Sequence, residues 1–322
     1  MMKLFFLLIC AMASLTLKAE GLNYTYVSLG FPDSGDTRAL SINSSGTVLI
    51  QSLSPANYYS TYLWNGGATV PVKIPFPVAF AGGGINDYGA ITGNGGTLPG
   101  SSAFILDSSG LTQFQYSATS HISANGINDS GTVVGYYEFS GVSAHGYERS
   151  PTGVLTTIDV PNSEFTEAQA INNLGDIVGY YSNPADERIH GFLLRNGAFG
   201  DVTFPQSSRT EPNGINDLGD ITGIYIDSMS NSHGFVLAGD TYSTFDVPGA
   251  FFTVPLGIND SGSIVGLYGT EVGNRQVFEG FIATPVPEPG SIGLCTVCAM
   301  LLGISRLVVA LASARSSSGL RV

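Results

Sequence analysis

A six-residue phrase recurs six times along the chain at a nearly fixed interval. Each copy holds a small residue, Ile, Asn, a second polar residue, a variable residue and Gly, as in residues 126–131 (GINDSG). The first asparagines of successive copies are 43, 42, 44, 44 and 43 residues apart. Such a period indicates a fold built from repeated supersecondary units. The copies occupy residues 41–46, 84–89, 126–131, 170–175, 214–219 and 257–262.

Each period predicts four short strands and no helix. Runs rich in β-branched and aromatic residues alternate with Gly, Pro and Asn, and no run has a sustained 3.6-residue apolar period. The phrase lies between two such runs, and it predicts a hairpin turn, because Asn or Asp bonds nearby backbone and Gly accepts positive φ. We expect the Ile of each phrase, and the apolar residue two positions after the turn Gly, to point into the core.

Four strands in about 44 residues is the size of one blade of a β-propeller. Six copies predict an all-β, six-bladed β-propeller. The last copy ends after its third strand, at residues 280–282, and a matching strand stands at residues 24–29. We expect this N-terminal strand to complete the sixth blade, which closes the ring and removes an exposed sheet edge.

The two ends of the chain indicate export. Lys3 and the apolar stretch 4–13 have the form of a signal peptide covering residues 1–19, with cleavage before Glu20. Residues 20–285 then form the repeat domain. Residues 286–322 begin with Val286, Pro287, Glu288 and Pro289, and continue into apolar stretches separated by Arg306.

This order of short motif, apolar segment and basic residues resembles the PEP-CTERM sorting tail of exported bacterial proteins. The resemblance implies recognition by an exosortase, removal of the tail, and a location at the cell surface or outside the cell.

Arg306 leaves an apolar run of about 14 residues, short for a membrane span, so either the run ends there or a transmembrane helix continues to Ala314. A tail that stays as an unprocessed anchor is the other interpretation. The third strands, such as His145-Gly146-Tyr147, resemble the HAF-type extracellular repeats, which carry no activity that transfers to named residues.

Charge and composition exclude several classes of function. Residues 20–288 contain seven Lys and Arg against 25 Asp and Glu, a net charge of −18. Nucleic acid and anionic lipid are therefore excluded as partners, and membrane contact is expected only through the tail.

The three cysteines lie in the signal and tail segments, so disulfides do not hold the repeat domain. No nucleotide-binding loop, nucleophile elbow or EF-hand loop is present, and we predict no cofactor and no metal. The repeated His145, His190 and His233 predict a structural hydrogen bond in each third strand.

Functional residues are expected where the repeats differ, in the loops that lead into the inner strands. These loops carry aromatic rings beside charged groups, a combination that suits sugars: Glu164, Phe165, Arg209, Glu211, Phe251 and Phe252. We therefore predict a non-enzymatic binding or structural protein associated with extracellular polysaccharide or with another surface protein. The alternatives are a secreted glycan hydrolase or lyase using Glu164 with Glu211, and a recognition domain for peptides or small ligands.

Overall fold

The computed structural model describes residues 24–30, 36–53, 59–75, 83–96, 101–139, 143–273 and 275–286. The chain divides into two units, and the description that follows concerns the larger one, Tyr26–Thr284. The described residues form strands, turns and loops and no helix. The strands are β1 (Tyr24–Ser28), β2 (Asp36–Ile42), β3 (Val48–Leu53), β4 (Tyr59–Trp64), β5 (Thr69–Pro71), β6 (Ile91–Asn94), β7 (Ala103–Asp107), β8 (Gly110–Phe114), β9 (Ser120–Ile127), β10 (Val133–Phe139), β11 (His145–Arg149), β12 (Leu155–Ile158), β13 (Thr166–Ile171), β14 (Ile177–Asn183), β15 (Arg188–Arg195), β16 (Ala198–Val202), β17 (Arg209–Ile215), β18 (Ile221–Ile226), β19 (Ser232–Ala238), β20 (Thr241–Phe245), β21 (Phe252–Ile258), β22 (Ile264–Val272) and β23 (Arg275–Pro285).

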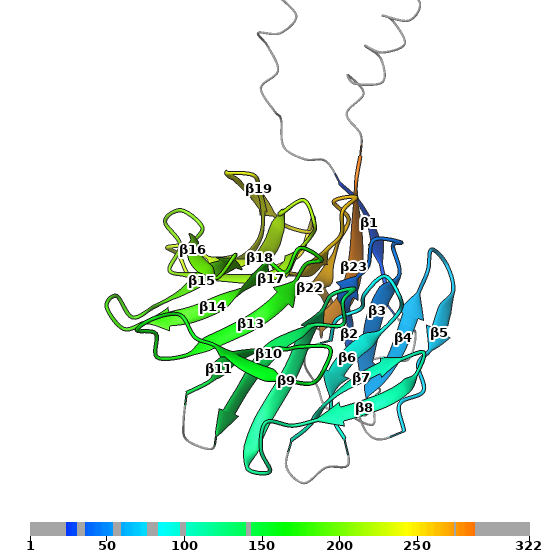
Figure 1. Ribbon diagram of the computed structural model, residues 1–322. Helices are drawn as coiled ribbons and strands as arrows, with labels where there is room; N and C mark the ends of the chain where they lie inside the picture. The colour runs from blue at the N-terminus through cyan, green and yellow to red at the C-terminus, as the bar shows by residue number, and fades with distance from the viewer. Residues whose placement is uncertain are drawn as a thin grey trace, which may run out of the picture. The chain divides into compact units, whose positions relative to one another are not determined.

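The strands form six antiparallel blades around one axis, so the predicted all-β, six-bladed β-propeller is confirmed (Figure 1). Blades 1, 3, 4 and 5 each have four strands: β2–β5, β9–β12, β13–β16 and β17–β20. Blade 2 contains β6–β8, and a single bridge between Ile85 and Ile91 marks its inner position. Blade 6 contains β21–β23, and β1 pairs with β23 in the same sheet.

The recurrent phrase forms the hairpin between the first and second strands of a blade, as predicted. In blade 4 the Asn172 N–H donates to the Asp176 carbonyl at 3.1 Å, and the Gly175 N–H donates back to the Asn172 carbonyl at 3.1 Å. Gly175 has φ +83°, a left-handed conformation that glycine adopts without strain. Ile171 and Ile177, on either side of the turn, are 8% and 2% exposed, so both point into the core as expected.

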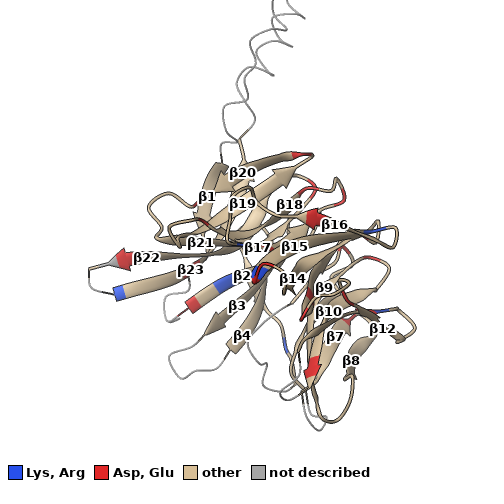
Figure 2. Ribbon diagram, turned by 90° about the vertical axis from the view of Figure 1, so that its left-hand side faces the viewer, with Lys and Arg blue, Asp and Glu red and all other residues tan. Residues whose placement is uncertain are grey.

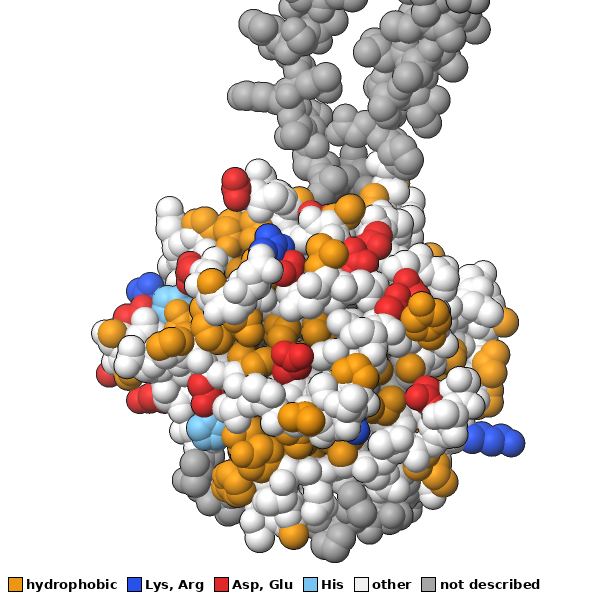
Figure 3. Space-filling view, in the orientation of Figure 1, with side chains coloured by type: hydrophobic (Ala, Val, Ile, Leu, Met, Phe, Trp, Pro, Cys, Tyr) orange, Lys and Arg blue, Asp and Glu red, His pale blue; other side chains and the backbone are white. Residues whose placement is uncertain are grey.

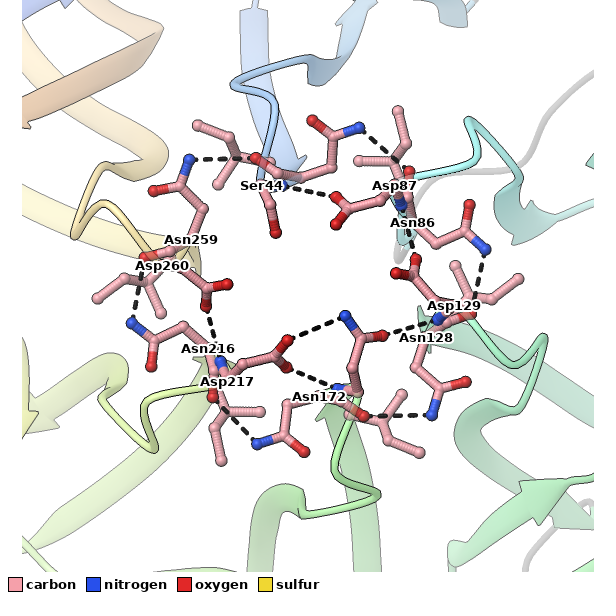
Figure 4. Close-up of a pocket in the computed structure, with 18 residues that line it drawn as sticks. Ser44, Asn86, Asp87, Asn128, Asp129, Asn172, Asn216, Asp217, Asn259 and Asp260 are labelled. Atoms are coloured by element: carbon pink, nitrogen blue, oxygen red, sulfur yellow. Dashed lines mark hydrogen bonds between the residues drawn. The ribbon is translucent and has the colours of Figure 1, made fainter.

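The same asparagines also join each blade to the next (Figure 4). The Asn172 Nδ2 donates to the Asn216 carbonyl of blade 5 at 3.0 Å, and its Oδ1 accepts the Asp176 N–H at 2.9 Å. The six inter-blade bonds measure 3.0–3.2 Å, and the last one runs from Asn259 back to the carbonyl of Asn43. We call this ring of six side chains the asparagine ring. Its members are Asn43, Asn86, Asn128, Asn172, Asn216 and Asn259.

The hydrophobic core lies between neighbouring blades. Val134 of β10 packs with Ile171, Ile177 and Phe192 of blade 4. Val178, at the same position of β14, packs with residues of blade 5, including Ile215, Ile221 and Phe235. Each blade therefore buries its face only against its neighbours, which is why the fold needs the whole ring.

Some predictions concern residues outside the described ranges. The signal peptide 1–19, the apolar tail and three residues of the sorting motif, Pro287, Glu288 and Pro289, lie outside them, while Val286 is described and exposed. Within the described ranges, the chain forms no apolar helix of the length that a membrane crossing requires.

Candidate functional site

A β-bulge in the inner strands of five blades directs one side chain of each into the central channel. In blade 4 the pairing shifts between Ala168, opposite Gly179, and Ala170, opposite Val178, so Gln169 has no partner of its own. Such an extra residue bends the strand and re-aims its side chain. The residue three positions before the ring asparagine is the bulged one in five blades: Leu40, Asn125, Gln169, Asn213 and Leu256.

In blades 3 to 6 a glycine on the second strand lies close against the bulged inner strand, whereas Ile50 holds this position in blade 1. A Cβ placed on Gly179 would lie 2.0 Å from the Glu167 carbonyl oxygen and 2.9 Å from the Ala168 Cα. Backbone atoms cannot yield by that amount, so only glycine fits. The equivalent positions with the same close approach to the inner strand are Gly135, Gly223 and Gly266.

The bulged side chains form the middle of the channel, which widens at one end. A cavity of about 390 Å³, here called the funnel, opens where the inner strands begin. Two narrower cavities of about 80 and 70 Å³ continue from it to the asparagine ring. The funnel is lined by Arg38, Leu40, Gly83, Ser123, Asn125, Tyr136, Glu167, Gln169, Tyr180, Asn213, Val254, Leu256 and Leu267.

One side of the funnel carries a continuous hydrogen-bond network. The Ser123 hydroxyl donates to Asn125 Oδ1 at 2.7 Å, and Asn125 Nδ2 donates to Gln169 Oε1 at 3.2 Å. Gln169 Nε2 donates to Glu167 Oε2 at 3.3 Å, and the Tyr180 hydroxyl donates to the same oxygen at 2.7 Å. The network crosses from blade 3 to blade 4 and ends on one carboxylate. It therefore holds a fixed acceptor at the funnel wall.

Burial makes this carboxylate easier to protonate. Burial raises the pKa of Glu167 above its ordinary value, the Tyr180 hydrogen bond lowers it, and the charges of Glu211 and Glu138 raise it further. Burial also raises the pKa of Tyr136 on the neighbouring blade to about 12. Acidic positions are spread over strands and loops of the ring, whereas basic ones are few (Figure 2). Arg38 also lines the funnel, but its charge is paired with Asp36 at 2.9 Å, so an additional anion would meet repulsion on the Glu167 side.

The other side of the funnel is mostly apolar, and Arg38 of blade 1 is the charged side chain in its lining. Leu40 of blade 1 and Val254, Leu256 and Leu267 of blade 6 line it, together with Gly83 of blade 2. Leu40 and Leu256 occupy the same bulge position that carries Asn125 and Gln169 in blades 3 and 4. One backbone position therefore supplies amides to one half of the wall and leucines to the other.

The predicted loop residues lie around the funnel and not in its wall. Glu164 is exposed, and its Oε2 accepts a hydrogen bond from Ser182 in the same blade at 3.2 Å. Phe165 is half-buried, with its ring edge against Tyr180 at a centroid distance of 6.3 Å. Phe165 therefore supports Tyr180, which lines the funnel, whereas Glu164 bonds to Ser182 outside the funnel.

The other four predicted residues belong partly to strands. Arg209 and Glu211 lie in β17 and Phe252 in β21, so their placement in loops was wrong. Arg209 forms an ion pair with Glu211, whose pKa is raised by burial and lowered by the Arg209 charge. Phe251 is 48% exposed and forms an aromatic cluster with Phe252 and Phe278. The structure thus brings Glu211 into electrostatic contact with Glu167, while Glu164 bonds within its own blade.

The repeated histidines form structural contacts, as predicted. His145 Nδ1 lies 3.0 Å from an Asp159 oxygen, and His233 Nδ1 lies 2.8 Å from an Asp246 oxygen. His190 Nδ1 lies 3.1 Å from the Thr203 hydroxyl. Each ring is also stacked on a tyrosine of the adjacent strand. These contacts fasten the third strand of blades 3, 4 and 5 to the residues that follow the fourth.

Sequence reasoning missed the funnel residues, although one signal pointed to them. The residue three positions before each ring asparagine varies among Leu, Gly, Asn and Gln, while its neighbours are nearly uniform and small. A variable, often polar side chain between small residues is what a bulge that faces a channel requires. Tyr136 and Tyr180 likewise follow the second-strand glycine in two blades.

Comparisons with known proteins concern the fold. No protein-family model matches the sequence, and no curated protein matches it. TolB from Acinetobacter baumannii is 15% identical, with a TM-score of 0.53 over 78% of this chain and 64% of that chain. AofleA from Arthrobotrys oligospora is 12% identical, with a TM-score of 0.50 over 81% of this chain and 87% of that chain. A fungal lectin from Aleuria aurantia, described as a six-bladed β-propeller that recognises fucose, is 13% identical over 82% of this chain and 100% of that chain. Its TM-score is 0.46, so it supports no argument about this chain. At these identities the first two likenesses show a shared fold and nothing about ligands.

Proposed function

We propose that this chain is an exported, non-enzymatic binding protein whose funnel receives a sugar unit of an extracellular polysaccharide. The observation that carries the proposal is the two-sided wall of the funnel. Pyranose rings present hydroxyl groups at their edges and C–H groups on their faces, so they need both hydrogen-bonding and apolar partners. The amides and Glu167 would bond the hydroxyls, and the leucines would pack on the C–H groups.

The electrostatics favour a neutral sugar in the funnel. Glu167 lies close enough to Glu211 and Glu138 for their charges to raise its pKa. A ligand that carries a carboxylate or sulfate would add a further negative charge to this group. A neutral hydroxyl donates to a carboxylate without that cost. Hydrophobic side chains also lie among carboxylates on the face shown in Figure 3, a combination that suits polysaccharide.

Calorimetric titration of the full chain with neutral and acidic oligosaccharides tests the proposal. We expect a neutral oligosaccharide to bind, and Glu167→Gln and Leu256→Ala each to weaken it at least tenfold. The matched control is Glu164→Gln, which changes a carboxylate outside the funnel and should leave the affinity unchanged. Binding that is unaffected by both funnel variants would refute the assignment. Release of reducing ends during incubation with the bound sugar would instead support the hydrolase alternative.

Export and sorting are part of the same proposal. The supporting features are the signal-like residues 1–19 and the tail 286–322, with Val286, Pro287, Glu288 and Pro289 at its start. Mass spectrometry of the protein recovered from its producing cells should find an N-terminus at Glu20 and no tail. An intact tail in the extracellular fraction would contradict processing by an exosortase.

We further infer that β1 closes the ring as the outer strand of blade 6. The pairing of β1 with β23 supports this, as does a hydrogen bond of 2.8 Å from the Leu29 N–H to the Gly280 carbonyl. The Ser28 hydroxyl also donates to Glu279 at 2.8 Å. Deleting residues 20–30 should lower the midpoint of thermal unfolding and expose β23. An unchanged midpoint would argue against this closure.

A further inference from the structure

A second cavity lies between blades 2 and 3, at the end of the ring that holds the asparagine turns. It measures about 450 Å³, and we call it the Arg149 groove. The turn before β6, the β7–β8 hairpin, the turn after β9 and the end of β11 enclose it. Ala90, Ile105 and Ile127 are buried at 8%, 9% and 6% exposure and form its apolar floor.

Arg149 breaks the pattern of the repeat at this place. The first residue of each second strand faces one residue of the third strand across the sheet. That third-strand residue is Arg149 in blade 3 and is apolar in every other blade. The five apolar equivalents are Trp64, Leu106, Leu194, Leu237 and Ala283. A guanidinium has therefore replaced an aliphatic or aromatic side chain at a half-buried site.

The fold itself makes little use of this charge. The Arg149 Cζ lies 4.7 Å from the Phe114 ring centroid, and Nη1 donates to the adjacent Ser150 carbonyl at 3.3 Å. The ion pairs among the described residues include Arg38, Arg195 and Arg209 but not Arg149. A guanidinium has five N–H donors. Most of these donors are thus available to a ligand in the groove.

The other residues of the groove add hydrogen-bond acceptors and an aromatic ring to the N–H donors of Arg149. The carboxylates of Asp107 and Asp129 line it. Asp107 Oδ1 accepts bonds from the Ser109 N–H and hydroxyl, and Asp129 Oδ1 accepts the Asp87 N–H. The second oxygen of each carboxylate can accept a bond from a ligand. Tyr88, at the variable position of the blade 2 turn, is 81% exposed and lines the opening. The groove therefore offers N–H donors from Arg149, two carboxylates as acceptors, and the Tyr88 ring above an apolar floor. These groups match the hydroxyl edge and the C–H face of a sugar.

We propose that the Arg149 groove is a second binding site, specific for a neutral sugar unit. Two carboxylates beside one guanidinium leave the site net negative, which disfavours uronic acids and sulfated sugars. The Arg149 fork would bond a pair of adjacent hydroxyls, Asp107 or Asp129 would accept from a hydroxyl, and Tyr88 would pack on the ring face. The groove and the funnel lie at opposite ends of the channel, so one molecule would hold two polysaccharide segments.

The repeat supplies a variant that removes the site and keeps the fold. Arg149→Leu installs the residue that blades 2, 4 and 5 already carry at this position. Tyr88→Ala is a second variant at an exposed turn position. Leu174→Ala, at the same turn position of blade 4, is the matched control, because Leu174 is 71% exposed and lies outside the groove.

The test uses the full chain and NMR titration with methyl glycosides of the common neutral hexoses and deoxyhexoses, with methyl glucuronide as the anionic probe. We expect at least one neutral glycoside to shift the resonances of Tyr88 and the Arg149 side chain. Arg149→Leu and Tyr88→Ala should each weaken that binding at least tenfold, while Leu174→Ala and the funnel variant Glu167→Gln should leave it unchanged. The proposal is overturned if no neutral glycoside binds, if Arg149→Leu binds as well as the native chain, or if the glucuronide binds more tightly. Binding lost in Glu167→Gln but kept in Arg149→Leu would support the funnel alone and reject the groove.

Discussion

Replacing one member of the asparagine ring tests how the blades are joined. Asn172 is 4% exposed, and its side chain makes three shorter hydrogen bonds and a longer one of 3.4 Å from Nδ2 to Asp176 Oδ2. Nδ2 donates to the Asn216 carbonyl of the next blade at 3.0 Å, and Oδ1 accepts the N–H groups of Leu174 and Asp176 at 3.1 and 2.9 Å. Asn172→Ala removes all of these bonds at once. It leaves the Leu174 and Asp176 N–H groups without a partner, and the Asn216 carbonyl keeps only the bond of 3.1 Å from the Gly219 N–H.

The expected loss follows from the three shorter bonds. A hydrogen bond in a folded protein contributes about 1 kcal/mol net to stability. The free energy of unfolding should then fall by about 3 kcal/mol. Leu174→Ala, in the same turn and 71% exposed, should change it by less than about 0.5 kcal/mol.

Urea unfolding followed by two probes measures this effect. Trp64, the single tryptophan of the chain, lies in β4 of blade 1, far along the sequence from Asn172 in blade 4. Tryptophan fluorescence and circular dichroism should therefore shift to the same lower midpoint if the ring unfolds as one unit. A loss of Asn172→Ala no larger than that of Leu174→Ala would refute the structural role of the asparagine ring. A shift seen by circular dichroism alone would show that blades 1 and 4 unfold separately.

Three further predictions follow from buried charge, a histidine and a glycine. Because the pKa of Glu167 is raised in the fold, this carboxyl does not destabilise the native state below its ordinary value of 4.5 and destabilises it increasingly as pH rises through the folded pKa. Glu167→Gln should thus be more stable than the native chain at pH 8 and lose that advantage at pH 4, measured by thermal unfolding; a constant difference would contradict the shift. The hydrogen bond to Asp246 raises the pKa of His233, so its contribution is present below pH 6.5 and lost as pH rises through the folded pKa. His233→Gln should destabilise more at pH 5.5 than at pH 9, and equal losses would reject this. Gly179→Ala should cost about 1–3 kcal/mol in urea unfolding, because its Cβ would meet the Glu167 carbonyl; a neutral effect would show that the bulge can relax.

The blade count and the turn could be predicted from the sequence because both depend on local rules. Asn followed by Gly three residues later specifies a tight turn wherever it occurs between two extended runs. The burial of Ile171 and Ile177 follows from the alternation of side chains on strands that flank that turn. Neither inference depends on the position of the neighbouring blade.

The inter-blade role of Asn172 could not be predicted in that way. Its Oδ1 serves the local turn, but its Nδ2 bonds a residue 44 positions away. The hairpin explanation accounted for Asn172 completely, so nothing in the sequence called for a second role. The near-constant interval of the repeat was the relevant evidence for this second role. A hydrogen bond repeated around a ring requires every blade to place the same carbonyl at the same level along the ring axis, and equal spacing of the repeats allows this.

The bulge explains why the funnel was harder to find than the loops. Regular alternation along the inner strand would place Gln169 on the wrong face, because the bulge inserts an extra residue. The bulge also separates the two tasks of the strand. Residues on either side of it, such as Ala168 and Ile171, pack between blades and must stay small or apolar. Gln169 faces the channel and is free to differ from blade to blade. A ring built from six similar turns can therefore change its channel lining at the bulges without changing its core, and Asn125, Gln169 and Asn213 opposite Leu40 and Leu256 are the result of that freedom.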